Sequence, residues 1–312
     1  MKPFSLFVAG AATAAILAAC GSGSSSSALS GLSPRQAAIN ALQKFQSTSL
    51  KYDLDGKISI DASKVQNAPP DVVNQITQAL GGSNGLTISG TGEQESQQRV
   101  KVTVSLKPLV SETITGVQYD GTFYYSLDGG KTFGSGGSLS SLTSGFSITP
   151  DQSAKLFGGL PDSSFTEKGQ TSIDGVTVEH YQATFTKDQL FQSIAGGSGS
   201  SSSAEQNLQL IEQFITIPSA TVDSYIRTDN GAFDRYGANI TLGFDLGKLV
   251  QAFGGVGSGA SGASGTPSGT LFIGILASVH LHDYGASIHI DKPTVDPNAP
   301  KLPSGLGGLF GG

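Results

Sequence analysis

The sequence predicts an α+β fold, in which a large antiparallel sheet carries several inserted helices. Many segments of strand length alternate apolar and polar residues, the pattern of a sheet with one buried and one solvated face. Asp-Gly or Asn-Gly pairs separate several of these segments, and such pairs favour tight hairpin turns. Other segments carry apolar residues at helical spacing. Hydrophobic residues make up 37% of the 312, so the chain can bury a core of its own.

The N-terminus has the three parts of a bacterial lipoprotein signal. Lys2 supplies a positive charge, residues 4–18 are apolar but too short for a permanent membrane span, and residues 17–20 read LAAC, the lipobox pattern. We therefore expect residues 1–19 to be removed as a signal peptide and Cys20 to be lipidated. Acyl chains such as palmitate would then hold the protein on the extracytoplasmic face of the cell membrane. The alternative is an ordinary secretory signal followed by a chance cysteine.

The rest of the chain is expected to form one domain behind a tether. Residues 20–32 are rich in Gly and Ser and predict a flexible, lipidated tether. The domain is expected over residues 33–295, with Gly/Ser-rich surface loops at 196–203 and 254–269, because the segments between these loops hold too few strands to fold alone. The Pro/Gly-rich residues 296–312 predict an irregular tail.

The first half of the domain opens on a helix. Ser33 and Pro34 are the favoured residues for the N-cap and first position of a helix, and its apolar stripe continues to about residue 47. Further elements are expected in this order: strands at 50–54 and 57–61, a helix at 69–80, a strand at 100–107 that alternates Val or Leu strictly with polar residues, and a hairpin at 117–125 that turns at Asp-Gly.

The second half repeats this mixture of short helices and hairpins. Helices are expected at 150–157, 187–195 and 204–215. Strands are expected at 165–170, 176–185, 220–228, 232–245, 271–283 and 287–292, the last two forming a hairpin around residues 284–285.

This order of elements resembles the LolA/LprG-like half-barrel lipoproteins, including the LppX/LprG group of actinobacterial envelopes. The stretches that carry the resemblance are residues 117–125, 172–181, 225–231 and 281–293. The resemblance implies a large curved antiparallel sheet, the half-barrel, with inserted helices covering its concave face. It also implies an apolar cavity between sheet and helices that binds or transfers acyl chains, lipids or glycolipids.

Apolar residues on the predicted strands are the candidates for lining such a cavity. Branched and aromatic walls suit an alkyl chain, because an alkyl chain offers no partner to a buried polar group. Taken singly, each of these residues is more often part of a packed core than of a cavity wall. The candidates are Val100, Val102, Val104, Leu106, Phe123, Tyr125, Tyr225, Ile240, Leu242, Phe244, Ile275 and Val279.

Two further features have a functional and a plain interpretation. The helix at 204–215 lies beside a Gly/Ser run and is either a lid over the cavity or an ordinary covering helix. His280 and His282 share one face of a strand, and the predicted hairpin could bring His289 opposite them. Three imidazoles could hold zinc or copper, but the same face is the solvated side of the strand, so we predict no metal.

Composition and missing motifs argue against other functions. The net charge is −6 without a basic cluster, which disfavours nucleic acid as a partner. The sequence holds no G-x-S-x-G elbow at a strand–helix junction, no Walker A loop and no H-E-x-x-H, so we expect no enzyme activity and no cofactor. The leading hypothesis is a lipid-binding or lipid-transfer lipoprotein of the cell envelope. The alternative is a structural or protein-interaction lipoprotein with a filled core.

Overall fold

The structure is a computed structural model that describes residues 27–67, 85–108, 113–135, 157–191, 212–248 and 268–299, together with Asn74, Thr77, Gln78 and Gly82. Its elements are α1 (Pro34–Ser47), β1 (Leu50–Asp61), β2 (Val65–Gln66), β3 (Leu86–Ser96), β4 (Arg99–Lys107), β5 (Ile114–Tyr119), β6 (Thr122–Ser126), β7 (Gly134–Ser135), the 3-10 turn η2 (Asp162–Ser164), β8 (Phe165–Ile173), β9 (Val176–Thr184), β10 (Ile215–Arg227), β11 (Phe233–Asp245) and β12 (Ser268–His282).

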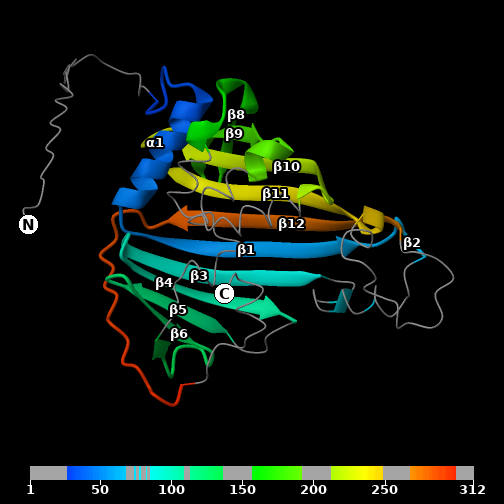
Figure 1. Ribbon diagram of the computed structural model, residues 1–312. Helices are drawn as coiled ribbons and strands as arrows, with labels where there is room; N and C mark the ends of the chain where they lie inside the picture. The colour runs from blue at the N-terminus through cyan, green and yellow to red at the C-terminus, as the bar shows by residue number, and fades with distance from the viewer. Residues whose placement is uncertain are drawn as a thin grey trace, which may run out of the picture.

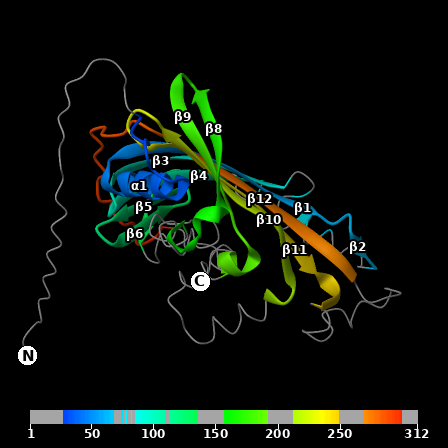
Figure 2. The ribbon, with the colours of Figure 1, turned by 90° about the horizontal axis from the view of Figure 1, so that it is seen from above.

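The strands form one large antiparallel sheet that stays open. Its order is β7-β6-β5-β4-β3-β1-β12-β11-β10-β9-β8, and β2 pairs with β12 off this path. Two meanders, one from each half of the chain, are therefore joined at the centre by β1 and β12 (Figure 1). Figure 2 shows the strong twist of the sheet and the β8–β9 hairpin rising away from it. The predicted α+β class with a curved half-barrel sheet is confirmed.

Helix α1 lies across one end of the sheet (Figure 1). Its start is fixed as predicted: the Ser33 hydroxyl accepts from the Gln36 amide, the Gln36 side chain accepts from the Ser33 amide, and Pro34 occupies the first turn. Its end is fixed by Gln94 of β3, whose side chain donates to the carbonyls of Phe45 and Thr48 at 2.8 and 3.0 Å. The helix thereby buries one apolar stripe against the sheet.

Two predicted elements differ in the structure. The strands predicted at 50–54 and 57–61 are one continuous strand, β1, because Gly56 continues the ladder between β3 and β12. The strand predicted at 287–292 is wrong: residues 286–292 pair with no strand, so no hairpin forms around residues 284–285, and the chain returns to the sheet only at Val295, which bridges Phe133.

Residues 286–296 instead form a strap, the orange-red segment in Figure 1. The strap packs over β5 and β6, on the side of the sheet that carries Val117 and Tyr124. Ile290 of this strap is 3% exposed and packs with Val117 and Tyr124 in a small separate core. The Ile290 amide donates to Glu95 at 2.9 Å. Because this hydrogen bond favours the ionised carboxylate, it holds the pKa of Glu95 below its ordinary value.

Several predictions fall outside the described residues. These are the signal peptide, Cys20 and most of the tether, the helices at 69–80 and 204–215 apart from a few positions, most of the helix at 150–157, the Gly/Ser runs and most of the tail. The described end of the 204–215 segment differs from the prediction, since Ile215 begins β10. No helix among the described residues is long and apolar enough to cross a membrane.

Candidate functional site

One face of the sheet collects nearly all the predicted cavity-lining side chains. Antiparallel partners point to the same side of a sheet, and the register pairs Ile240 with Ile275 and Leu242 with Ile273. At the centre of the sheet, Val279 of β12 pairs with Leu54 of β1. Leu54 pairs in turn with Gly90 of β3, and Gly90 with Val104 of β4, so these side chains lie on the same side of the sheet. The candidates of β4, β6, β11 and β12 therefore share this surface, which we call the apolar face.

The apolar face is covered unevenly by the described residues. At the end under α1, a core cluster includes Ala41, Leu50 and Phe157, all essentially unexposed. A second cluster on the same face includes Ile58 and Leu106. Further apolar side chains on this face remain half-buried and belong to neither cluster, a set that we call the open strip: Leu54, Val100, Val102, Leu242, Phe244 and Ile275.

Tyr225 does not belong to the apolar face. On β10 the buried residues are Val222, Ser224 and Ile226, so Tyr225 points to the opposite, polar face. There its ring stacks on His180, with ring centres 4.3 Å apart. The prediction for Tyr225 was wrong, because the alternation of β10 places its ring on the polar face.

The predicted histidine cluster is divided. His280 and His282 lie near Asp53 of β1, with nitrogen–oxygen distances of 3.8 and 3.5 Å. His289 lies in the strap, where its exposed side chain approaches Asp291 at 3.1 Å. The missing hairpin separates these sites, and within the described part of the chain no group of His, Cys, Asp or Glu is arranged to hold a metal ion.

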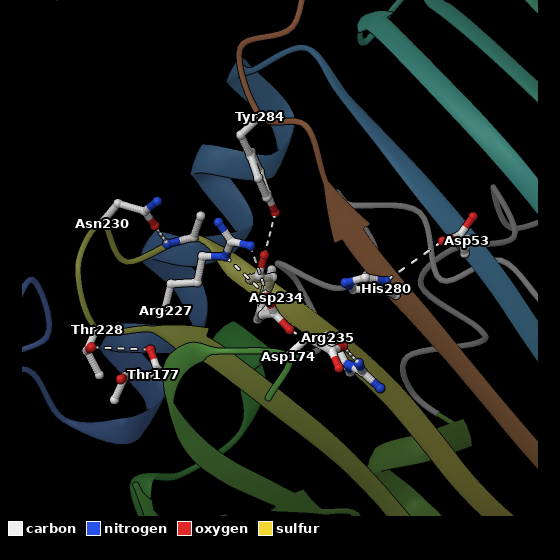
Figure 3. A network of polar contacts seen from close by, with 12 residues as sticks. Asp53, Asp174, Thr177, Arg227, Thr228, Asn230, Asp234, Arg235, His280 and Tyr284 are labelled. Atoms are coloured by element: carbon white, nitrogen blue, oxygen red, sulfur yellow. Dashed lines mark hydrogen bonds and ion pairs between the residues drawn. The ribbon is translucent and has the colours of Figure 1, made fainter. Parts of the chain in front are cut away.

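The polar face also carries a charged network that the sequence did not suggest. The carboxylate of Asp234 is 3% exposed and accepts from Arg227 Nε and Nη2 at 3.2 and 3.1 Å (Figure 3). Arg235 lies 3.7 Å from the same carboxylate and also pairs with Asp174 in the β8–β9 turn. Tyr284 donates to the Phe233 carbonyl at 2.7 Å, and burial raises its pKa. This network joins the turns at one end of the sheet.

A pocket of about 520 Å³ lies beside α1, at the point where the described chain begins. Its apolar wall includes Leu29 and Leu32, and its polar wall includes Asn40, Gln43 and Lys44 of α1. Asn230, in the turn between β10 and β11, completes it and accepts a hydrogen bond from Lys44 Nζ through its carbonyl. No sequence pattern predicts this site, because Lys44 and Asn230 are 186 positions apart.

Neither a family model nor a curated protein matches the chain. Among solved structures, the chain is similar to the lipoprotein LppX of Mycobacterium tuberculosis, with 8% identity, a TM-score of 0.41, and coverage of 83% of this chain and 98% of that chain. It is similar to LprF of Mycobacterium bovis, with 10% identity, a TM-score of 0.39, and coverage of 83% and 96%. A putative outer membrane lipoprotein-sorting protein domain from Vibrio parahaemolyticus gives 8%, 0.25, and coverage of 82% and 95%.

Lipoproteins of the kind that the sequence resembles are thus among the structures that overlay on this chain.

Proposed function

We propose that this protein is a lipid-anchored protein of the cell envelope that binds acyl chains on its apolar face. The observation that carries the proposal is the open strip, a set of aliphatic and aromatic side chains on the apolar face that are half-buried and lie outside both core clusters. An acyl chain is a suitable occupant, because it removes apolar surface from water and leaves no hydrogen bond unmade. Lipidation at Cys20 would keep the domain beside the source of such chains.

The test compares two neighbouring residues that point to opposite faces. Leu242, a member of the open strip, and Thr241 are both half-buried on β11, Leu242 on the apolar face and Thr241 on the polar face. Leu242→Gln places an amide against any bound alkyl chain and should weaken uptake of a fluorescent fatty acid at least tenfold. Thr241→Gln adds the same amide on the far side and should leave uptake unchanged.

Native mass spectrometry of the chain from residue 21 onwards supplies the second readout. We expect a co-purified lipid, or uptake of an added fatty acid, in the unaltered chain and in Thr241→Gln. The structural lipoprotein with a filled core is the competing function, and the well-packed cluster under α1 favours it. A mass without lipid and no fatty-acid uptake would establish that alternative and exclude the carrier.

The anchoring part of the proposal has its own test. Cys20→Ala removes the thiol that would receive the lipid, so the variant should carry no acyl chains when metabolically labelled with a palmitate analogue. Labelling that persists in Cys20→Ala would contradict the lipobox assignment.

A further inference from the structure

We infer that the pocket beside α1 binds the phosphate of a phospholipid headgroup from the membrane that carries the anchor. The inference rests on the anchoring part of the proposed function and is independent of the open strip. It assigns the pocket a ligand with a charged head and an apolar body, and both parts have matching walls in the structure.

The position of the pocket relative to the anchor is the first argument. Ala28 lines the pocket and is held in place by its amide, which donates to the Thr228 carbonyl at 2.8 Å. Ala28 follows Cys20 by eight positions, and eight fully extended residues span at most about 28 Å. A pocket tied this closely to a lipidated cysteine stays within reach of headgroups.

The charge of the pocket is the second argument. The protein is acidic overall, yet the pocket is lined by one cation, Lys44, and by no carboxylate. An ammonium has three N–H groups, and the Asn230 carbonyl accepts one of them. The side chains of Asn40 and Gln43 can donate from the same wall.

The end of α1 would ordinarily repel an anion, because the last carbonyls of a helix carry partial negative charge. Here Gln94 donates to the carbonyls of Phe45 and Thr48, which engages two of the groups at this end. Lys44 in the last turn adds a full positive charge. The polar wall is therefore suited to a phosphate.

The apolar wall is the third argument. Leu29 is 7% exposed and Leu32 is half-buried, and both pack against the core under α1. A wall of this kind can contact the glycerol and the first methylenes of a lipid, whereas inorganic phosphate gains nothing from it. The site should therefore discriminate between a phospholipid and free phosphate.

The experiment uses the full lipidated chain in dodecyl maltoside, a detergent without phosphate. Ser30→Cys places a thiol beside the pocket for an environment-sensitive dye, because position 30 is exposed and the natural thiol at Cys20 is blocked by lipid. The labelled protein is titrated with dihexanoylphosphatidylglycerol, glycerol 3-phosphate and inorganic phosphate. We expect saturable binding of the phospholipid and at least tenfold weaker binding of inorganic phosphate.

Lys44→Gln should weaken phospholipid binding at least fivefold, and Ser47→Asp, which adds a carboxylate at the rim, should weaken it as well. Lys57→Gln is the matched control, since Lys57 is equally exposed but lies on the sheet. Thermal melts confirm that each variant folds. The inference is overturned by the absence of saturable binding, by equal affinity for inorganic phosphate, or by unchanged affinity in Lys44→Gln.

Failure here is distinguishable from failure of the proposed function. Leu242→Gln should leave the phospholipid titration unchanged, while Lys44→Gln should leave fatty-acid uptake unchanged.

Discussion

Asp234 is the one charged residue among the described residues that is fully buried. Its carboxylate can stay ionised there because two arginines surround it. A carboxylate removed from water is tolerated when guanidinium groups compensate its charge and fill its hydrogen-bonding positions. Arg227 supplies two N–H groups to one oxygen, while Arg235 approaches the other. Removing the carboxylate charge therefore leaves the half-buried guanidinium of Arg227 without this partner, while Arg235 keeps only the exposed Asp174.

Asp234→Asn should lower the free energy of unfolding by about 3 kcal/mol, the usual cost of breaking a buried ion pair from one side. Urea unfolding followed by circular dichroism measures it. Asp174→Asn is the control: this carboxylate also pairs with Arg235, but it is 73% exposed, and we expect a loss below about 0.5 kcal/mol. Equal losses in the two variants would show that burial of Asp234 has no energetic consequence.

Ionised Glu179 should destabilise the folded protein at neutral pH, whereas a carboxylate in an ordinary ion pair stabilises it. Burial, together with the charge of Glu167, raises its pKa above the ordinary 4.5. The folded state therefore disfavours the ionised form, and the cost is present at neutral pH and vanishes as the pH falls below the unfolded pKa. Glu179→Gln should raise Tm by about 1–2 °C at pH 7 and leave it unchanged at pH 3.5. A larger gain at pH 3.5 than at pH 7 would refute this explanation.

At the scale of elements, the strap shows what alternation can and cannot predict. Residues 287–292 place Ile288 and Ile290 between polar residues, as a strand would, so the sequence predicted a last hairpin. The alternation was correct as a statement about two sides, because Ile290 is buried and Asp291 is exposed. It could not say that the apolar side packs on top of β5 and β6 and not beside β12, since the covering partner lies far away in sequence.

Ile290→Ala should cost about 2–4 kcal/mol, since it empties a small core that few other side chains can refill. The second expected result is local: amide exchange should speed up in residues 286–296 while β10 and β11 keep their protection. Ile288→Ala, which removes a half-buried side chain of the same strap, should cost less. Uniform loss of protection over the whole sheet would mean that the strap is not a separate unit.

The strands were predictable for a related reason, and Tyr225 shows the limit. The hairpin turns at Asp120-Gly121, Asp174-Gly175 and Asn230-Gly231 fall between paired strands; the two Asp-Gly pairs have positive φ at both residues, and Asn230-Gly231 has it at Gly231. Within a strand, period-two alternation sorted residues into two sets correctly. Tyr225 was assigned to the wrong set, although Asp223 and Arg227, two positions away on either side, are charged and mark its face as the polar one.

At the scale of the whole molecule, two meanders from the two halves of the chain meet at β1 and β12, and their apolar faces become one surface. On β12, Val279 packs against the cluster under α1, and Leu271 lies eight positions earlier on the same face. At about 3.4 Å per residue this length is about 27 Å. An acyl chain in one membrane leaflet spans only about 15 Å, half the hydrocarbon core.

The apolar face is thus longer than half the hydrocarbon core of a membrane, and this length sets a prediction about acyl-chain length. Each methylene buried adds about 0.8 kcal/mol, so affinity for saturated fatty acids should rise about tenfold for every two methylenes from eight to sixteen carbons, without a plateau. Competition with a fluorescent fatty acid measures the series. A short closed cavity would instead give a maximum at some intermediate length, followed by a fall, because further methylenes would have to remain in water or force the wall apart. Leu242→Gln should lower the whole series, whereas Thr241→Gln should leave its slope and its height unchanged, since the slope comes from the apolar face alone.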